Sequence, residues 1–342
     1  MQNKDFIIMK KIAIIGCGTT LAKNLLELLA LRGSSKENIA VFENKVVGNT
    51  KVSFGEDELS VLPIENLNFS DFGAAIFTGH SQIASQYALK MAAAGIKVIN
   101  ATSAFEGDEK IPMIVGGINE DVIYTASKNI INVPNPHVTT LLGALAGIHK
   151  KYQIKTLRIS SYVATDYEGQ DGMSELYNQT RKILMNDSAS ANGLFHKTIA
   201  FNVIPQVGSF IGEETFNEWA YNSQIKQILG GDIKVHANCA FVSAFVGVGQ
   251  FANIETQKEI DADIATDDIK KAKGVLVVDK QEDGGYVSLN DVQGENTIFI
   301  SRIRQDMTVE NGISLWIAGD VYKIAAQNIL ALLKQFSKKD NQ

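Results

Sequence analysis

Residues 11–21 read KIAIIGCGTTL, and this stretch decides how the first half of the chain folds. The apolar run 12–15 predicts a buried strand, and the two glycines that follow it, Gly16 and Gly18, predict a tight turn. Leucines then recur at helical spacing from Leu21 onward. A strand that passes through Gly-x-Gly into a helix is typical of dinucleotide-binding domains, because the N–H groups at the helix start attract a pyrophosphate.

The same alternation of strand and helix continues up to residue 135. Short apolar segments at 39–42, 74–77 and 97–99 are predicted strands, and 81–94 is a predicted helix. Uniformly apolar strands separated by helices predict a parallel sheet that is covered on both faces. Residues 1–135 are therefore predicted to form a Rossmann domain, which is a doubly wound parallel sheet.

From residue 154 the strand segments become longer and fewer. The predicted strands are 157–164, 233–247, 297–303 and 313–318, with helices near 173–186, 216–229 and 266–274. This pattern predicts a mixed α/β domain over residues 136–320. An amphipathic helix over 321–336 follows it. The predicted fold class is α/β, with a doubly wound domain and a mixed domain.

Composition excludes several classes of protein. The chain has 342 residues, 45% of them hydrophobic and 20% charged, as in an ordinary globular protein of about two domains. Its net charge of −6 argues against a nucleic-acid surface, and no apolar run is long enough for a membrane span. The start lacks a secretory signal, and two cysteines cannot form a disulfide framework, so we expect a cytoplasmic protein. The histidines are spaced too widely for a metal site, and no metal is expected.

The glycine loop by itself leaves two interpretations open. The third small residue of the fingerprint falls at Ala22 instead of Leu21, so a tight turn without a ligand is the alternative to a nucleotide site. Glu43 follows the second strand and could accept the ribose hydroxyls of NAD while repelling the 2′-phosphate of NADP, although Lys45 could partly offset that repulsion. The candidate cofactor-binding residues are Gly16, Gly18, Thr19, Thr20, Glu43 and Lys45.

Five blocks along the chain carry a resemblance to a known family. They are NATSAF at 100–105, VPNPHVTT at 133–140, IAFNVIPQ at 199–206, RIRQD at 302–306 and NGISLW at 311–316. In order and spacing they resemble the aspartate-semialdehyde dehydrogenases. The resemblance implies a homodimer formed through the central domain 136–320, and a C-terminal segment 321–342 that returns to the Rossmann domain. It also implies NADP-dependent interconversion of aspartyl-4-phosphate and aspartate semialdehyde through a cysteine thioester.

The residues that the family uses for this chemistry are replaced here. In the turn 135–140, Val138 stands at the position of the nucleophilic cysteine, and Val248 stands at the position of the basic histidine. The resemblance also places Phe241 at the substrate-clamping arginine, Val163 at the orienting glutamine, Gln224 at the glutamate for the substrate amino group and Asp320 at the asparagine for the nicotinamide amide. No catalytic residue is predicted, and no metal ligand.

Some polar residues remain near these positions. Lys226, Asn135 and His137 are the predicted remnants of the substrate and phosphate site. Asp166, Glu168 and Asp171 are expected to be solvated carboxylates of the adjacent loop.

Three hypotheses follow. The first is a family member that has lost catalysis and acts by binding a metabolite or a protein partner, with NAD(P) binding weak or lost. The alternatives are an active semialdehyde dehydrogenase, and an NAD(P)-linked oxidoreductase of changed substrate that uses no cysteine thioester. In each case a homodimer is expected. The apolar residues expected at its interface are Phe201, Val203, Ile204, Leu315 and Trp316.

Overall fold

The computed structural model describes residues 11–188, 193–230 and 232–338. The prediction about the chain start therefore lies outside the described residues. The chain forms two compact units. Unit 1 consists of Met1–Asn135 and Ala325–Gln342, and unit 2 consists of Pro136–Ile324.

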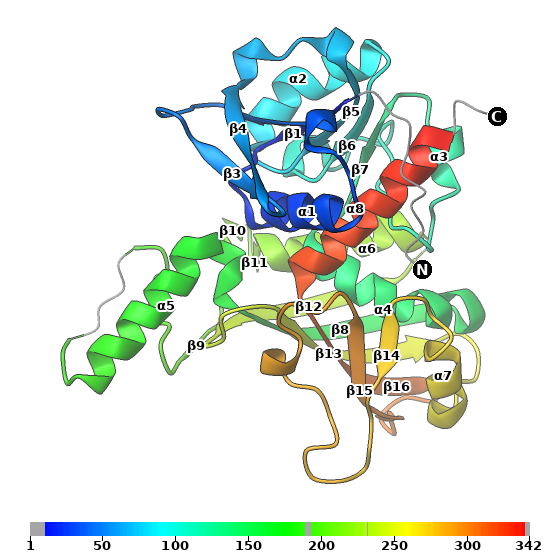
Figure 1. The fold of residues 1–342 in the computed structure, drawn as a ribbon. Helices are drawn as coiled ribbons and strands as arrows, with labels where there is room; N and C mark the ends of the chain where they lie inside the picture. The colour runs from blue at the N-terminus through cyan, green and yellow to red at the C-terminus, as the bar shows by residue number, and fades with distance from the viewer. Residues whose placement is uncertain (1–10, 189–192, 231, 339–342) are drawn as a thin grey trace. The chain divides into compact units, whose positions relative to one another are not determined.

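Unit 1 is built on a seven-stranded sheet in the order β3-β4-β2-β1-β5-β6-β7 (Figure 1). Every neighbouring pair is parallel except β3 with β4. The strands are β1 (Lys11–Ile15), β2 (Ile39–Glu43), β3 (Lys51–Phe54), β4 (Asp57–Pro63), β5 (Phe72–Phe77), β6 (Lys97–Asn100) and β7 (Ile130–Asn132). Helices α1 (Thr20–Leu31) and α2 (Ser81–Ala93) cover opposite faces, which confirms the predicted Rossmann domain.

The apolar pattern of the sequence explains this arrangement. Residues 12–15 of β1 are buried, and so are Leu25, Leu26 and Leu29 on one side of α1. The chain runs from β1 to β2 on one side and later returns to β5 on the other. The carboxyl end of β1 therefore lies at the switch point of the sheet, where doubly wound domains bind their ligands. The short helix α3 (Val122–Thr125) and the part of α8 (Val321–Lys338) from Ala325 onward complete the unit.

Unit 2 contains a mixed seven-stranded sheet in the order β14-β15-β16-β13-β8-β12-β9. Its strands are β8 (Ile154–Val163), β9 (Val203–Ile204), β12 (Lys234–Val242), β13 (Val248–Thr256), β14 (Val275–Val277), β15 (Ile298–Gln305) and β16 (Gly312–Gly319). Helices α4 (Pro136–Tyr152), α6 (Phe216–Leu229) and α7 (Ala262–Ile269) pack against the sheet. Helix α5 (Gly169–Leu184) extends from the sheet (Figure 1), and the hairpin of β10 (Phe210–Ile211) and β11 (Glu214–Thr215) contacts α6.

The structure corrects some boundaries. The predicted strand over 233–247 ends at Val242, and β13 is a separate strand that begins at Val248. Gly247 has a φ of +100° in the connection, which a residue with a side chain rarely adopts. Strands β3, β4 and β7 are not evident in the sequence, because they are short or lack a long apolar run. Helix α4 begins at Pro136, where the sequence suggests only a turn.

Candidate functional site

The glycine loop of unit 1 joins β1 to α1 and is shaped by close backbone packing. Gly16 has a φ of +92°, and a Cβ on it would overlap the backbone of Gly79. Thr19 caps α1, since its Oγ1 accepts a hydrogen bond from the N–H of Ala22 at 3.2 Å. Thr20 is the first residue of that helix. The loop thus combines a tight glycine turn with a capped helix start, and this arrangement fits a bound dinucleotide.

Glu43 reaches this loop from the end of β2. Its Oε1 accepts a hydrogen bond from the N–H of Gly18 at 2.9 Å, which fixes the carboxylate beside the turn. Lys45, two residues further on, is exposed. Cys17 is buried in the same turn, and burial, followed by the charge of Glu43, raises the pKa of its thiol to about 12. The structure therefore brings Glu43 to the glycines and keeps Cys17 protonated.

The first turn of α4 in unit 2 holds the position where the family resemblance implies a nucleophile. Val138 is fully buried there, and His137 is only 1% exposed. Burial lowers the pKa of His137 to about 3, so its imidazole is neutral at physiological pH. The backbone carbonyl of His137 accepts a hydrogen bond from Gln250 Nε2 at 3.1 Å, which ties the start of α4 to β13. Asn135, at the end of unit 1, is half-buried and directly precedes this helix.

Two further valines stand at the positions implied for the base and the orienting glutamine. Val248 begins β13 and pairs in register with Val163 of β8. Both side chains are fully buried, as is that of Val138. None of these three side chains can donate an electron pair or carry a proton. The positions where the resemblance implies the nucleophile, the base and the orienting glutamine are therefore part of the apolar core of unit 2.

An aromatic cluster, defined here as His137, Tyr167, Phe195 and Phe241, fills the space beside the first turn of α4. The Tyr167 ring centroid lies 5.6 Å from that of His137 and 5.6 Å from that of Phe241. Phe241 in turn meets Phe195 edge to face at 5.0 Å. Tyr167 was not among the predicted site residues, although a bulky aromatic residue between two loop carboxylates indicates a side chain that packs inward.

Asp166 is not the solvated carboxylate that the sequence suggests. It is only 2% exposed; its Oδ2 accepts the N–H of Gly247 at 3.1 Å, and its Oδ1 has no hydrogen-bond partner within the described residues. Burial raises its pKa to about 7, and repulsion from Asp320 contributes. Asp320 is also buried, and its Oδ2 accepts the N–H of Gly294 at 3.0 Å. Asp171, in contrast, is exposed as expected.

Lys226, the last of the predicted remnants of the substrate and phosphate site, lies on the surface of unit 2. Lys226 is exposed on α6, whereas Gln224, two residues before it, is buried against the sheet. Within the described residues, no group of three or more His, Cys, Asp or Glu side chains could hold a metal ion. No helix in the described part of the chain is both long and apolar enough to cross a membrane.

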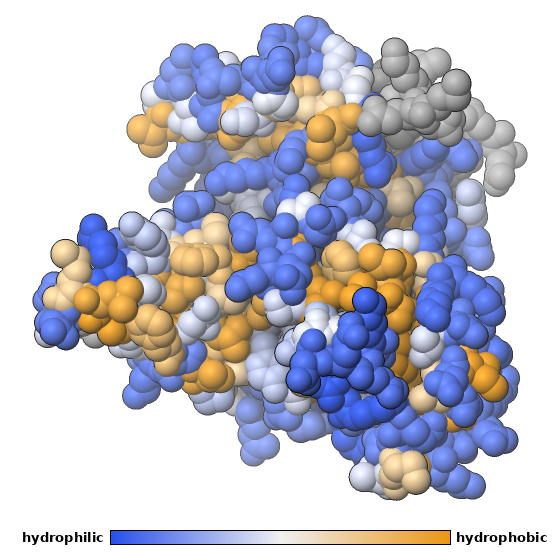
Figure 2. Space-filling view, turned by 60° about the horizontal axis from the view of Figure 1, so that its bottom comes forward, coloured by the Kyte–Doolittle hydropathy of each residue, from blue (hydrophilic) through white to orange (hydrophobic). Residues whose placement is uncertain are grey.

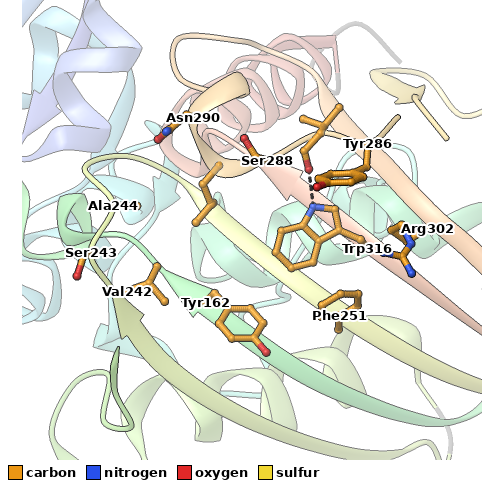
Figure 3. A pocket seen from close by; sticks show the side chains of 12 residues that line it. Tyr162, Val242, Ser243, Ala244, Phe251, Tyr286, Ser288, Asn290, Arg302 and Trp316 are labelled. Carbon is orange, nitrogen blue, oxygen red and sulfur yellow. Dashed lines mark hydrogen bonds between the residues drawn. The ribbon is translucent and has the colours of Figure 1, made fainter. Parts of the chain in front are cut away.

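A second feature of unit 2, the sheet-face hollow, lies on the sheet and encloses about 610 Å³. Its floor is formed by Tyr162, Phe251 and Trp316, from β8, β13 and β16 (Figure 3). The Trp316 indole N–H donates to the Val287 carbonyl at 2.8 Å, and Arg302 lies at the rim. Figure 2, turned to bring the lower side of Figure 1 forward, shows hydrophobic side chains gathered over unit 2.

The expected interface residues are only partly on the surface. Phe201 and Val203 are 67% and 57% exposed, and Trp316 lines the sheet-face hollow. Ile204 and Leu315 are buried inside the subunit, so their prediction as interface residues is wrong. Leu315 precedes Trp316 on β16, and successive residues of a strand point to opposite faces.

Two family models match the chain. The semialdehyde dehydrogenase NAD binding domain matches residues 11–126, and the semialdehyde dehydrogenase dimerisation domain matches residues 145–321. The first match includes the glycine loop, and the second includes β13 with Val248 and the sheet-face hollow. The fold and the two family models together therefore define a protein of the semialdehyde dehydrogenase class.

Individual relatives narrow this class. Aspartate-semialdehyde dehydrogenase from Rickettsia bellii is 33% identical over 331 residues, which cover 96% of this chain and 97% of the relative. The Bacillus subtilis enzyme of the same name is 30% identical, with 96% and 97% coverage. The solved structure of aspartate semialdehyde dehydrogenase II from Vibrio cholerae has a TM-score of 0.89 at 27% identity and covers 95% of this chain and 97% of that chain. The chain belongs to the aspartate-semialdehyde dehydrogenase family, which confirms the resemblance.

Proposed function

We propose that this chain uses the semialdehyde dehydrogenase scaffold to bind a small molecule or a partner, and that it does not form a cysteine thioester. The observation that supports this proposal is the apolar burial of Val138 and Val248, with the aromatic cluster packed beside α4. A thioester needs a thiolate and a group that accepts its proton. Cys239 does not replace them, because burial raises its pKa to about 12.

An active aspartate-semialdehyde dehydrogenase is the second candidate, and the comparisons favour it over a loss of catalysis. Its support is that the relatives described above carry this name and match the chain over nearly its whole length. Such an activity would need another nucleophile. Thr139 and Thr140 are nearest in sequence, but both are buried, and the Thr140 hydroxyl donates to the Pro136 carbonyl at 3.0 Å. An alcohol also needs a strong base, and Val248 supplies none.

A nicotinamide nucleotide is the proposed ligand of unit 1, and NAD is preferred over NADP. Gly16, Gly18, Thr19 and Thr20 would hold its pyrophosphate at the start of α1. Glu43 would accept the ribose hydroxyls and would repel a 2′-phosphate, while the exposed Lys45 offsets this only weakly because solvent screens it. When bound, the cofactor supplies a hydride acceptor. This capacity is what supports an oxidoreductase of changed substrate as a third candidate.

We also propose a homodimer located in the cytoplasm. The match to a dimerisation domain supports self-association, and the sheet-face hollow supplies an apolar surface for it. Three aromatic rings at its floor, with centroids 4.8 to 6.4 Å apart, form a rigid platform of the kind found at the centre of interfaces. A second copy placed against this platform would remove the aromatic rings from water.

The oxidation of aspartate semialdehyde, followed in the presence of phosphate and either NADP or NAD, tests the main proposal. The Bacillus subtilis relative, purified in the same way, is the positive control. We expect turnover at least a thousandfold below that control, because removal of nucleophile and base costs many powers of ten. Turnover within a hundredfold of the control would establish the second candidate instead.

A further inference from the structure

A small pocket opens beside the aromatic cluster in unit 2. Its volume is about 140 Å³, which is room for about four or five waters. Polar and aromatic side chains share its wall: Glu168, Phe195, His196, Gln206, Ser209 and Phe241. Each of these residues lies in unit 2, so the pocket is complete within that unit.

The charge of this pocket is negative. Glu168 is its only carboxylate, no lysine or arginine lines it, and Glu168 forms no ion pair within the described part of the chain. Burial raises the pKa of Glu168, and only the neighbouring, exposed His196 opposes that rise. A partly desolvated carboxylate without a cationic partner is stabilised by any cation that binds next to it.

The aromatic wall of the pocket adds a second reason for a cationic ligand. Phe195 and Phe241, whose rings meet at an interplanar angle of 83°, both line the pocket. Ring faces attract ammonium groups. Phe241 also stands where the family resemblance implies an arginine, so this wall has exchanged a positive charge for an aromatic ring. Gln206 Nε2 donates to the Gly208 carbonyl at 3.3 Å, which leaves the Gln206 Oε1 as an acceptor.

We propose that this pocket binds a small aliphatic ammonium compound, with its cationic group paired to Glu168 and its hydrocarbon part against Phe195 and Phe241. The proposal rests on the binding role proposed above and gives that role a ligand class. The volume limits the ligand to a few heavy atoms. An anionic ligand is disfavoured, because Glu168 would repel it and no basic side chain other than His196 is present to hold it.

Calorimetric titration of the full chain at pH 7.5 tests this with three probes of similar size. Propylammonium should bind saturably, whereas propanol and propionate should not. Glu168→Gln should weaken propylammonium binding tenfold or more, because the amide can still accept a hydrogen bond but no longer pairs its charge with the ammonium group. Asp171→Asn, an exposed carboxylate on α5, is the matched control and should leave the affinity unchanged. Equal binding of propanol, preferred binding of propionate, or no saturable binding of any probe would overturn the proposal.

The pH dependence provides a measurement on the unaltered pocket in case Glu168→Gln does not fold. Affinity for propylammonium should fall as the pH falls, since protonation of Glu168 removes the negative charge. The titration is repeated with His196→Gln, which removes the imidazole beside Glu168, so that the pH dependence of this variant reports on Glu168. An affinity that does not change with pH in this variant would refute the pairing. These results do not depend on the dehydrogenase assay, so the two proposals can fail separately.

Discussion

Replacement of Asp166 by asparagine should stabilise unit 2 at pH 8 and have little effect at pH 4. In the folded protein the pKa of Asp166 is raised from 3.8 to about 7, mainly by burial. A carboxyl whose pKa is higher when folded holds a proton that the unfolded chain releases. The contribution of this carboxyl to the free energy of unfolding is therefore fully present below about pH 4 and is lost as the pH rises toward 7. Asparagine keeps an oxygen that can accept the N–H of Gly247 and carries no charge at any pH.

The size of the effect follows from the shift in pKa. A rise in pKa of about three units, at 1.36 kcal/mol each, gives roughly 4 kcal/mol as the upper limit of the change in the free energy of unfolding. Repulsion between Asp166 and Asp320 makes the two carboxyls titrate as a pair. We therefore expect Asp166→Asn to raise the free energy of unfolding at pH 8 by about 2 to 4 kcal/mol.

Urea unfolding followed by tryptophan fluorescence measures this directly, since both tryptophans, Trp219 and Trp316, belong to unit 2. Asp171→Asn, on the exposed side of α5, is the control and should shift stability equally little at both pH values. An Asp166→Asn variant that is destabilised by the same amount at pH 4 and pH 8 would refute the reasoning. That result would mean that the hydrogen bond to Gly247 matters and the buried charge does not.

Three further predictions concern the glycine loop and the dimer. Gly16→Ala should destabilise unit 1 by about 2 kcal/mol or more and remove any thermal stabilisation by NAD, because its Cβ would overlap Gly79; a variant with unchanged melting would contradict this. Glu43→Gln should raise the affinity for NADP about tenfold relative to NAD in calorimetry, and an unchanged ratio would show that Glu43 does not select the cofactor. Light scattering should give about twice 37.2 kDa, and Phe251→Asp should shift this mass toward the monomer with little change in melting; a monomeric unaltered chain would exclude the proposed homodimer.

The fold was predictable because its signals are local. Residues 11–20 contain in one segment the apolar strand, the positive φ of Gly16 and the helix start at Thr20, so the Rossmann domain follows without tertiary information. The position of Glu43 beside the loop was likewise predictable, since it ends the strand next to β1. The sequence blocks at 199–206, 302–306 and 311–316, which resemble the family, then made the fold of unit 2 predictable as well.

The interior of the candidate site was less predictable, since it depends on which side of the chain faces the core. The sequence predicts a surface carboxylate at Asp166, but its loop packs against Gly247, and the side chain is buried. Tyr167 fills the space beside His137, and only the packed structure brings these rings together. The burial of Leu315, in contrast, could have been inferred from strand alternation with Trp316.

The central claim is that no side chain of this protein forms the acyl intermediate of its family. The most direct test is the intact mass of the protein, quenched in acid seconds after mixing with aspartate semialdehyde and NADP or NAD without phosphate. Contaminating enzymes do not acylate this chain, so the measurement is free of the background that affects turnover assays. We predict an unmodified mass, under conditions in which the Bacillus subtilis relative shows an acyl adduct. An adduct of the same mass increment on this chain, located by peptide mapping to Thr139, Thr140 or a cysteine, would contradict the account.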